Sequence, residues 1–554
     1  MTARLNKTIS LDTRHRLFGY ARDEDGSMLV FGMALFLIML MLGGMAVDLM
    51  RYEQRRTLLQ QTNDRAVLAA ASLTQTRSPT VVVDDYFDKA GLSQYLRNVT
   101  VTEGINFRMV EADAEATLQP FFMQMMGIDR LEVPSSAVAE QRITNVEIVM
   151  VLDVSGSMNE PTGGTTKIAA MKTAAMEFVD TVKARDTENR ITITIVPYNA
   201  QVNIPAVLRD KYNITNQHGR ANVNCVEFPQ AAFNTLTLSR TTAYPMYAFA
   251  DLTGATTQDS TYVAWNHTSQ GLMNPAASYC RDVPGNILRL PGDNATQLKA
   301  SINGLVAAGN TSTTLGMKWG VALIDPVARP MMTELMNAGQ IPASHSGRPY
   351  DWDDRDSMKV IIVMTDGDHV EHVRIRDDYK TGPAPIWRST GDGNYSVQHT
   401  TGRPLAAGAN EYYVPHLNTW QATPWNSGAG LAQQTWQQVW QTQRLRWVAW
   451  QLYARPLGTD SATRTGVFNT WMANFRSTWM AEATMDTTML QSCTQAKTNG
   501  VVIYGIAYEA PPQGQAVISG CASSPAHYFN AQGLNVQTAF RAIASNISQL
   551  RLTQ

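Results

Sequence analysis

The stretch IVMVLDVSGSM, Ile148 to Met158, decides how the rest of the chain is interpreted. It begins with five apolar residues, a continuous run that is typical of a strand buried on both faces of a parallel sheet. Asp153 ends the run, and Ser155 and Ser157 follow it at alternate positions. Ligands of open α/β sheets bind beyond the carboxyl ends of the strands, so we expect these three side chains to face a binding site.

Four such runs predict the strands of one sheet. They are VEIVMVLD (146–153), ITITIVPY (191–198), MKVIIVMTD (358–366) and GVVIYGIAY (500–508). Stretches with apolar residues at helical spacing lie after the first run and at the end of the chain. This alternation indicates βαβ crossovers, and we predict an α/β fold with a doubly wound, mainly parallel sheet.

Further oxygen-bearing side chains follow the same kind of strand. Asp366 ends the third run and is followed by Gly367, and the hydroxyl-rich segment GNTSTTLG (309–316) precedes a helical stretch. Carboxylates and hydroxyls without sulfur or imidazole suit Mg²⁺ or Mn²⁺ better than zinc. Because so few of these groups are charged, a bound ion would remain able to accept a carboxylate from a partner.

In these residues the chain resembles the von Willebrand factor A domain with its metal-ion-dependent adhesion site. The three parts of that motif occur in order, at Asp153, Ser155 and Ser157, at Thr311 and at Asp366. The resemblance implies one Mg²⁺ (or Mn²⁺ or Ca²⁺), which Ser155, Ser157 and Thr311 coordinate directly. It implies that the aspartates bind the ion directly or through water, and that an acidic partner residue completes the shell. The alternative is an inherited fold whose site does not use metal.

Two long segments interrupt the predicted domain, which covers residues 145–554. They lie at about 203–291 and 370–481, and we expect surface insertions with some structure of their own. The second holds nine of the 12 tryptophans, whose partly helical spacing favours a packed face over an aromatic ligand platform. His369 and His372 follow Asp366, and we expect them to be solvated loop residues rather than metal ligands.

The N-terminal part contains an apolar run of twenty uncharged residues, 28–47. At about 1.5 Å per residue it matches the roughly 30 Å hydrocarbon core of a bilayer. A cleaved signal peptide is the alternative, but the run is longer than the usual apolar region of such a peptide. Helix-forming residues continue beyond the run, so we predict one helix over 27–74 after a cytoplasmic segment, 1–26. Alternating strands and an apolar helical turn then predict a small α+β unit over 75–144.

The four cysteines fall into two local pairs without the C-x-x-C spacing of zinc or redox sites. Three disulfide pairings are possible, and we favour the sequence-local one. It joins Cys225 to Cys280 and Cys493 to Cys521. Disulfides form outside the reducing cytoplasm, so the part of the chain after the apolar run is expected to lie outside it.

The N-terminal region also resembles the TadE/TadG-like proteins of the tight-adherence (Flp) pilus system. The likeness rests on D-G-S-M before the apolar run and on GGMAVDLMRYEQRRTLLQQTNDRAVLAAA at its end; the C-terminal GCASSPAHYFNAQ adds to it. It implies a pilus-assembly component or minor-pilin-like adhesin in the bacterial inner membrane, facing the periplasm or the cell surface. Its expected partners are other pilus proteins or a surface ligand, and the bilayer through 28–47. Cleavage after Gly26 would leave Phe31 where pilins usually carry glutamate, which leaves processing open.

The composition argues against two other classes of function. A net charge of -2 and 17% charged residues give no basic field for nucleic acid. No Ser/His/Asp order, P-loop, H-E-x-x-H or nucleophile elbow occurs in a suitable context, so we predict a protein without enzymatic activity. The expected function is metal-dependent adhesion or assembly, and the alternative is a structural pilus or membrane scaffold.

Overall fold

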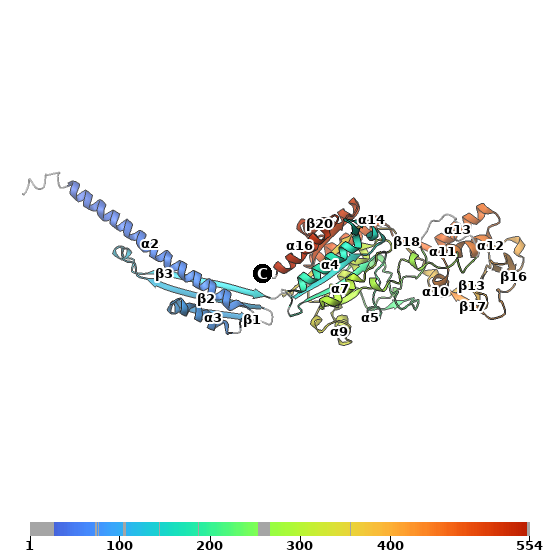
Figure 1. The fold of residues 1–554 in the computed structure, drawn as a ribbon, viewed down its shortest axis with the longest axis horizontal. Helices are drawn as coiled ribbons and strands as arrows, with labels where there is room; N and C mark the ends of the chain where they lie inside the picture. The colour runs from blue at the N-terminus through green and yellow to red at the C-terminus, as the bar shows by residue number, and fades with distance from the viewer. Residues whose placement is uncertain are drawn as a thin grey trace, which may run out of the picture. The chain divides into compact units, whose positions relative to one another are not determined.

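The computed structural model describes residues 27–72, 75, 77–103, 107–142, 145–184, 186, 188–252, 266–354 and 356–550. The chain divides into two compact units, Met1–Ile143 with Leu552–Gln554 and Thr144–Arg551. Each unit is described by itself below (Figure 1). The predicted cytoplasmic segment 1–26 lies outside the described residues, and so does Gly26, after which cleavage was considered.

The first unit is organised around one long helix, α2 (Ser27–Ala71), of 45 residues. It has the length and apolar composition needed to cross a membrane. Most of its apolar N-terminal half is exposed, whereas its C-terminal half buries Leu59, Ala66 and Ala70 against a sheet. The change from an exposed apolar half to an amphipathic half follows the change in sequence after Asp48.

The sheet of the first unit is antiparallel and has the order β1-β2-β3. Its strands are β1 (Leu96–Glu103), β2 (Phe107–Leu118) and β3 (Leu131–Arg142). Alternate residues of β2, such as Val110, Ala112 and Ala114, are buried in the core that includes α2 residues. The sequence predicted these strands, and the helical turn between β2 and β3 is the 3₁₀ turn η3 (Met123–Met126). Helix α3 (Pro79–Lys89) was not predicted.

A six-stranded sheet with the order β10-β7-β4-β11-β19-β20 forms the centre of the second unit. Its pairs are parallel except for the antiparallel pair of β10 and β7. The strands are β4 (Asn145–Asp153), β7 (Ile191–Tyr198), β10 (Arg289–Gly292), β11 (Ser357–Thr365), β19 (Val502–Tyr508) and β20 (Tyr528–Ala531). The four predicted runs supply the four inner strands, and the two short edge strands were not predicted.

Helices cover both faces of this sheet. One face packs on α4 (Lys167–Lys183), α7 (Ala295–Asn303) and α16 (Asn535–Leu550). The other packs on α8 (Thr313–Ile324), α14 (Glu482–Thr498) and α15 (Pro512–Cys521), and α9 (Arg329–Asn337) belongs to the same core. Ile148 and Met150 contribute to the first core, and Val149 and Val151 to the second. Because both faces are covered, the strands are largely apolar, and the buried Glu147 of β4 and Lys359 of β11 form an ion pair with each other.

The two insertions build one additional core rather than two separate ones. Residues of the first insertion, such as Val223 and Phe249, share a buried cluster with residues of the second, such as Trp440 and Phe475. Four of the predicted packed tryptophans, Trp436, Trp440, Trp447 and Trp450, are at most 5% exposed, which confirms the prediction of packing. In Figure 1 helices α10 to α13 and strands β13, β16 and β17 of the second insertion gather at one end of the unit, whereas β18 lies closer to the sheet.

Most elements of the insertions are short, and the longest is α13, with 15 residues. The first insertion contains α5 (Ala206–Arg209), β8 (Ile214–Thr215) and β9 (Tyr244–Pro245). The strands of the second are β12 (His372–Ile375), β13 (Pro383–Ser389), β14 (Tyr395–Gln398), β15 (Tyr412–Val414), β16 (Thr419–Gln421), β17 (Leu431–Thr435) and β18 (Arg476–Met480). Its helices are α10 (Trp436–Thr442), α11 (Leu445–Trp447), the π-helix η12 (Val448–Ala454), α12 (Arg455–Leu457) and α13 (Ser461–Phe475).

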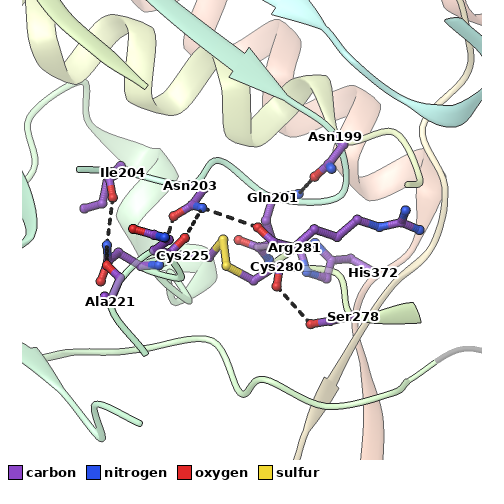
Figure 2. The surroundings of a disulfide bond; sticks show 12 residues. Asn199, Gln201, Asn203, Ile204, Ala221, Cys225, Ser278, Cys280, Arg281 and His372 are labelled. Atoms are coloured by element: carbon purple, nitrogen blue, oxygen red, sulfur yellow. Dashed lines mark hydrogen bonds between the residues drawn. A yellow bond between two sulfur atoms is a disulfide. The ribbon is translucent and has the colours of Figure 1, made fainter. Parts of the chain in front are cut away.

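Both disulfides have the sequence-local pairing. Cys493–Cys521 joins α14 to the end of α15. Cys225–Cys280 lies within the first insertion, beside the chain that leaves β7 (Figure 2). There Asn203 donates to the carbonyl oxygen of Asn222 at 2.6 Å and accepts from the backbone N–H of Asn224 at 2.9 Å. The disulfide thus joins two parts of the first insertion, and the contacts of Asn203 hold the insertion to the chain that leaves β7.

Candidate metal site

Two loops meet at the carboxyl end of β4. The loop after β4 carries Ser155 and Ser157, and the loop before α8 carries Thr311. The backbone N–H of Gly156 donates to the carbonyl oxygen of Gly309 at 2.8 Å. A Cβ atom at Gly156 would lie 3.3 Å from that oxygen, so the close approach favours glycine. The approach fixes the two hydroxyl-bearing loops against each other.

The predicted ligands come together at this place. Ser157 Oγ donates to Asp366 Oδ1 at 2.7 Å, and Ser155 Oγ lies 3.3 Å from the same oxygen. The two serine oxygens are 2.9 Å apart. Thr311 Oγ1 and Ser157 Oγ lie 3.6 and 3.9 Å from the position that a Cβ atom of Gly367 would occupy. All four side chains therefore converge on the edge formed by β4 and β11.

Asp153 lies behind these residues and is fully buried. Its carboxylate accepts hydrogen bonds from the Ser155 backbone N–H at 2.7 Å, from Thr365 Oγ1 at 2.8 Å and from the Tyr198 hydroxyl at 3.3 Å. Burial, followed by the negative charge of Asp366, raises the pKa of Asp153 to about 7. Two carboxylates thus share a site from which water is largely excluded, and a cation would relieve their repulsion.

The donor set fits a hard divalent cation. Oxygen ligands about 2.1 Å from Mg²⁺ in an octahedral shell are roughly 3.0 Å apart. The oxygens of Ser155, Ser157 and Asp366 are separated by 2.7–3.3 Å. Ser157 and Gly367 are partly exposed, whereas Asp153, Ser155 and Asp366 are buried. The part of the site formed by Ser157 and Gly367 is therefore the part that a partner can reach.

Lys167 is a component of the site that sequence reasoning missed. It is the first residue of α4, is 5% exposed, and lies with Nζ 3.2 Å from Asp366 Oδ2 and 2.8 Å from Glu160 Oε2. The lysine places a positive charge directly beside one predicted metal ligand. Its position at the start of the helix after the D-x-S-x-S loop was a usable signal. Tyr198 and Thr365, which bond to Asp153, were also missed, although Tyr198 ends one predicted strand and Thr365 is the second-last residue of another.

The expectation for His369 and His372 was wrong in one respect, because both are buried rather than solvated. His369 hydrogen-bonds to Asp486 at 2.6 Å and accepts from the Thr314 backbone N–H at 3.1 Å. The His372 ring lies 2.6 Å from the amide nitrogen of Gln201. Both histidines therefore hold the start of the second insertion against the core.

A cavity of about 520 Å³ opens beside the Thr311 loop. Asn310, which precedes Thr311, forms part of its wall together with Tyr279 from the first insertion and Glu371 and Arg476 from the second. Thr478 Oγ1 donates to Glu371 at 3.0 Å across this wall. The insertions thus add a polar surface next to the predicted ligands.

A comparison with known protein families gives a match for the N-terminal helix. Residues 26–73 match the Flp pilus-assembly TadE/G-like family. No curated protein matches the chain.

Several solved structures are similar at low identity. The von Willebrand factor domain of the type V pili tip protein Mfa5 from Porphyromonas gingivalis is 13% identical; the match covers 74% of this chain and 96% of that one, with a TM-score of 0.30. The pilus adhesin SpaC from Lactobacillus rhamnosus GG is 12% identical; the match covers 82% of this chain and 34% of that one, with a TM-score of 0.28. The pilus adhesin RrgA from Streptococcus pneumoniae is 9% identical; the match covers 82% of this chain and 50% of that one, with a TM-score of 0.26. TM-scores of this size do not establish a shared fold. What the comparisons show is a similarity of the N-terminal helix: residues 26–73 match the Flp pilus-assembly TadE/G-like family.

Proposed function

We propose that the chain is a non-enzymatic, envelope-anchored component of the Tad/Flp pilus, acting in assembly or as a minor-pilin-like adhesin. Its second unit is an A-type domain with a doubly wound sheet, and the site at the edge of that sheet holds one Mg²⁺, Mn²⁺ or Ca²⁺. The observation that carries the proposal is the convergence of hydroxyl and carboxylate oxygens on Asp366, with the buried Asp153 behind them. The partner is an acidic side chain of another pilus protein or of a surface ligand.

Each residue of the site has a defined task in this proposal. A bound divalent ion supplies the positive charge that attracts the carboxylate of the partner. Ser157 presents a neutral oxygen on the accessible side, 2.9 Å from the buried hydroxyl of Ser155, so neither serine repels that carboxylate. Thr365 and Tyr198 hold the Asp153 carboxylate in a fixed orientation. The neighbouring cavity gives the insertions a surface for the residues that flank the acidic side chain.

The anchor in this proposal is the apolar half of α2, which crosses the inner membrane once through residues 28–47. Its side chains are largely exposed in the isolated chain, as expected for residues that face lipid. The two disulfides of the second unit support a position outside the cytoplasm. The family match over 26–73 supports placing this anchor in a pilus system.

A structural component that does not use metal is the second candidate, and one contact favours it. Lys167 forms an ion pair with Asp366, so one of the two carboxylates already has a positive partner within the chain. In that case the site stabilises the edge of the sheet, and the loops serve only as a scaffold. The two candidates differ in whether Asp153 is needed for function or only for stability.

Attachment of cells tests the proposal. Asp153→Ala is compared with Asp351→Ala, which removes an exposed carboxylate that pairs with Arg329. We expect Asp153→Ala to reach the envelope in normal amounts but to lose pilus-dependent attachment, and we expect Asp351→Ala to retain it. Wild-type cells should lose attachment on chelation and regain it with Mg²⁺ or Mn²⁺. Normal attachment by Asp153→Ala cells would favour the scaffold.

A further inference from the structure

The loop between β2 and β3, residues 119–130, is fixed onto α2 by one buried carboxylate. The backbone N–H groups of Phe121, Phe122 and Met123 donate to Asp48 at 2.9, 2.7 and 2.9 Å. Asp48 is fully buried and directly follows the apolar run 28–47. Three charge-assisted hydrogen bonds to one side chain hold the loop at the position where that run ends.

A second contact places the loop alongside the apolar run itself. The Phe122 ring fills the space beside Gly44, where a Cβ atom would lie 2.3 Å from ring carbons. Any larger residue at position 44 would therefore displace the ring. On the other side of Asp48, the Arg51 guanidinium lies 4.1 Å from the centre of the Phe121 ring. At about 1.5 Å per residue, the contacts extend roughly 10 Å along α2 from Gly44 to Arg51.

The outer surface of this loop is apolar. Phe121 is 68% exposed, Met125 73%, Met126 50% and Ile128 39%. The side chains that β2 turns away from the core are different, since they include Glu111, Asp113 and Glu115. Large apolar side chains are thus concentrated at the end of the hairpin that is attached to the apolar run.

We propose that the loop 119–130 is a second membrane contact, which inserts its apolar tip into the interfacial region of the leaflet from which α2 emerges. The inference rests on the proposed span 28–47. With that span in the bilayer, Gly44 lies about 4.5 Å inside the apolar run, so the loop fixed beside it meets lipid. Phenylalanine and methionine are suited to the boundary between headgroups and acyl chains, and Arg51 lies at the level of the headgroups. The occupant of this surface is the lipid bilayer, and the contact sets the tilt of the first unit on the membrane.

Site-directed spin labelling of the full chain in phospholipid vesicles tests the proposal. All four native cysteines are in disulfides, so a single introduced cysteine can be labelled. Labels are placed in Met125→Cys at the loop, in Met39→Cys within the span, and in Val138→Cys. Val138 is 58% exposed and lies about 23 Å along β3 from Leu131, which makes it the matched control on the same hairpin. Collision with oxygen reports lipid, and collision with a water-soluble nickel chelate reports water.

We expect the label at 125 to collide more often with oxygen than with the nickel chelate, as the label at 39 does. The label at 138 should collide more often with the nickel chelate, as expected for a side chain in water. A label at 125 that behaves like 138, with 39 in lipid, would overturn the loop contact and leave the span intact. A label at 125 that is shielded from both reagents would also overturn it, because the loop would then be covered by protein. A label at 39 in water would contradict the proposed span itself.

Discussion

The six-stranded sheet and the core shared by the two insertions are both deeply buried, but they are encoded in different ways. Each inner strand of the sheet is one continuous run, and all nine residues of β4 are buried. The insertion core combines segments 203–291 and 370–481, and each contributes only part of the buried cluster. Each inner strand can therefore be recognised from a local stretch of sequence, whereas the insertion core forms only when two distant segments pack together. The site belongs to the sheet, so damage to the insertion core should spare it.

Removing the Cys225–Cys280 disulfide tests this separation and has the largest expected effect. The bond closes a loop of 55 residues, for which chain entropy predicts about 4 kcal/mol of stabilisation. We expect Cys225→Ala with Cys280→Ala to weaken the insertion core by about that amount. Urea unfolding followed by tryptophan fluorescence measures it, because nine of the 12 tryptophans belong to the second insertion.

Metal binding by the same double variant sharpens the comparison. We expect its affinity for Mn²⁺ to remain that of the wild type, because the predicted ligands lie at the carboxyl ends of β4 and β11 and on the loop before α8. A double variant that is less stable in urea and also binds Mn²⁺ more weakly than the wild type would show that the two regions are not independent.

The stability of the metal-free second unit should depend on pH through Asp153, by an amount on the order of a few kcal/mol. The folded state holds this proton up to about pH 7, whereas the unfolded state releases it near the ordinary value of 3.8. The contribution is therefore fully present below about pH 4 and is lost as the pH rises to about 7. Urea unfolding in EDTA between pH 4 and 8 measures it, and Asp153→Asn should remove this part of the dependence. Identical pH profiles for the two proteins would contradict the raised pKa.

Lys167→Met has the smallest expected effect and separates the two functions proposed for the site. Removing the charge beside Asp366 should raise the affinity for a divalent ion roughly tenfold, about 1.4 kcal/mol. Lys172→Met is the control, because Lys172 lies on the same helix but donates to the carbonyl oxygen of Asn303. Calorimetric titration with Mn²⁺ measures both. Unchanged affinity in Lys167→Met would mean that the lysine does not oppose the ion.

The sequence was most informative where structure is local. Continuous apolar runs gave the inner strands, and the apolar periodicity gave α4 and α16. The site motif indicated where its residues meet, because each part follows a strand or precedes a helix. The contact of Lys167 with Asp366 was missed because it joins residues 199 positions apart, so only the place of the lysine at the start of the helix after the D-x-S-x-S loop pointed to it. The burial of His369 and His372 was missed for a similar reason, because their partners, Asp486 and Gln201, come from distant segments.

Thermal unfolding of a soluble fragment, residues 145–554 with both disulfides intact, tests the central claim most directly. Wild type and Asp153→Ala are measured in EDTA and then in Mg²⁺ or Mn²⁺. A ligand at about 100 times its dissociation constant stabilises the folded state by roughly 2.7 kcal/mol. The account predicts a stabilisation of this size in the wild type and a much smaller one in the variant. The absence of a metal-dependent shift in the wild type would contradict it.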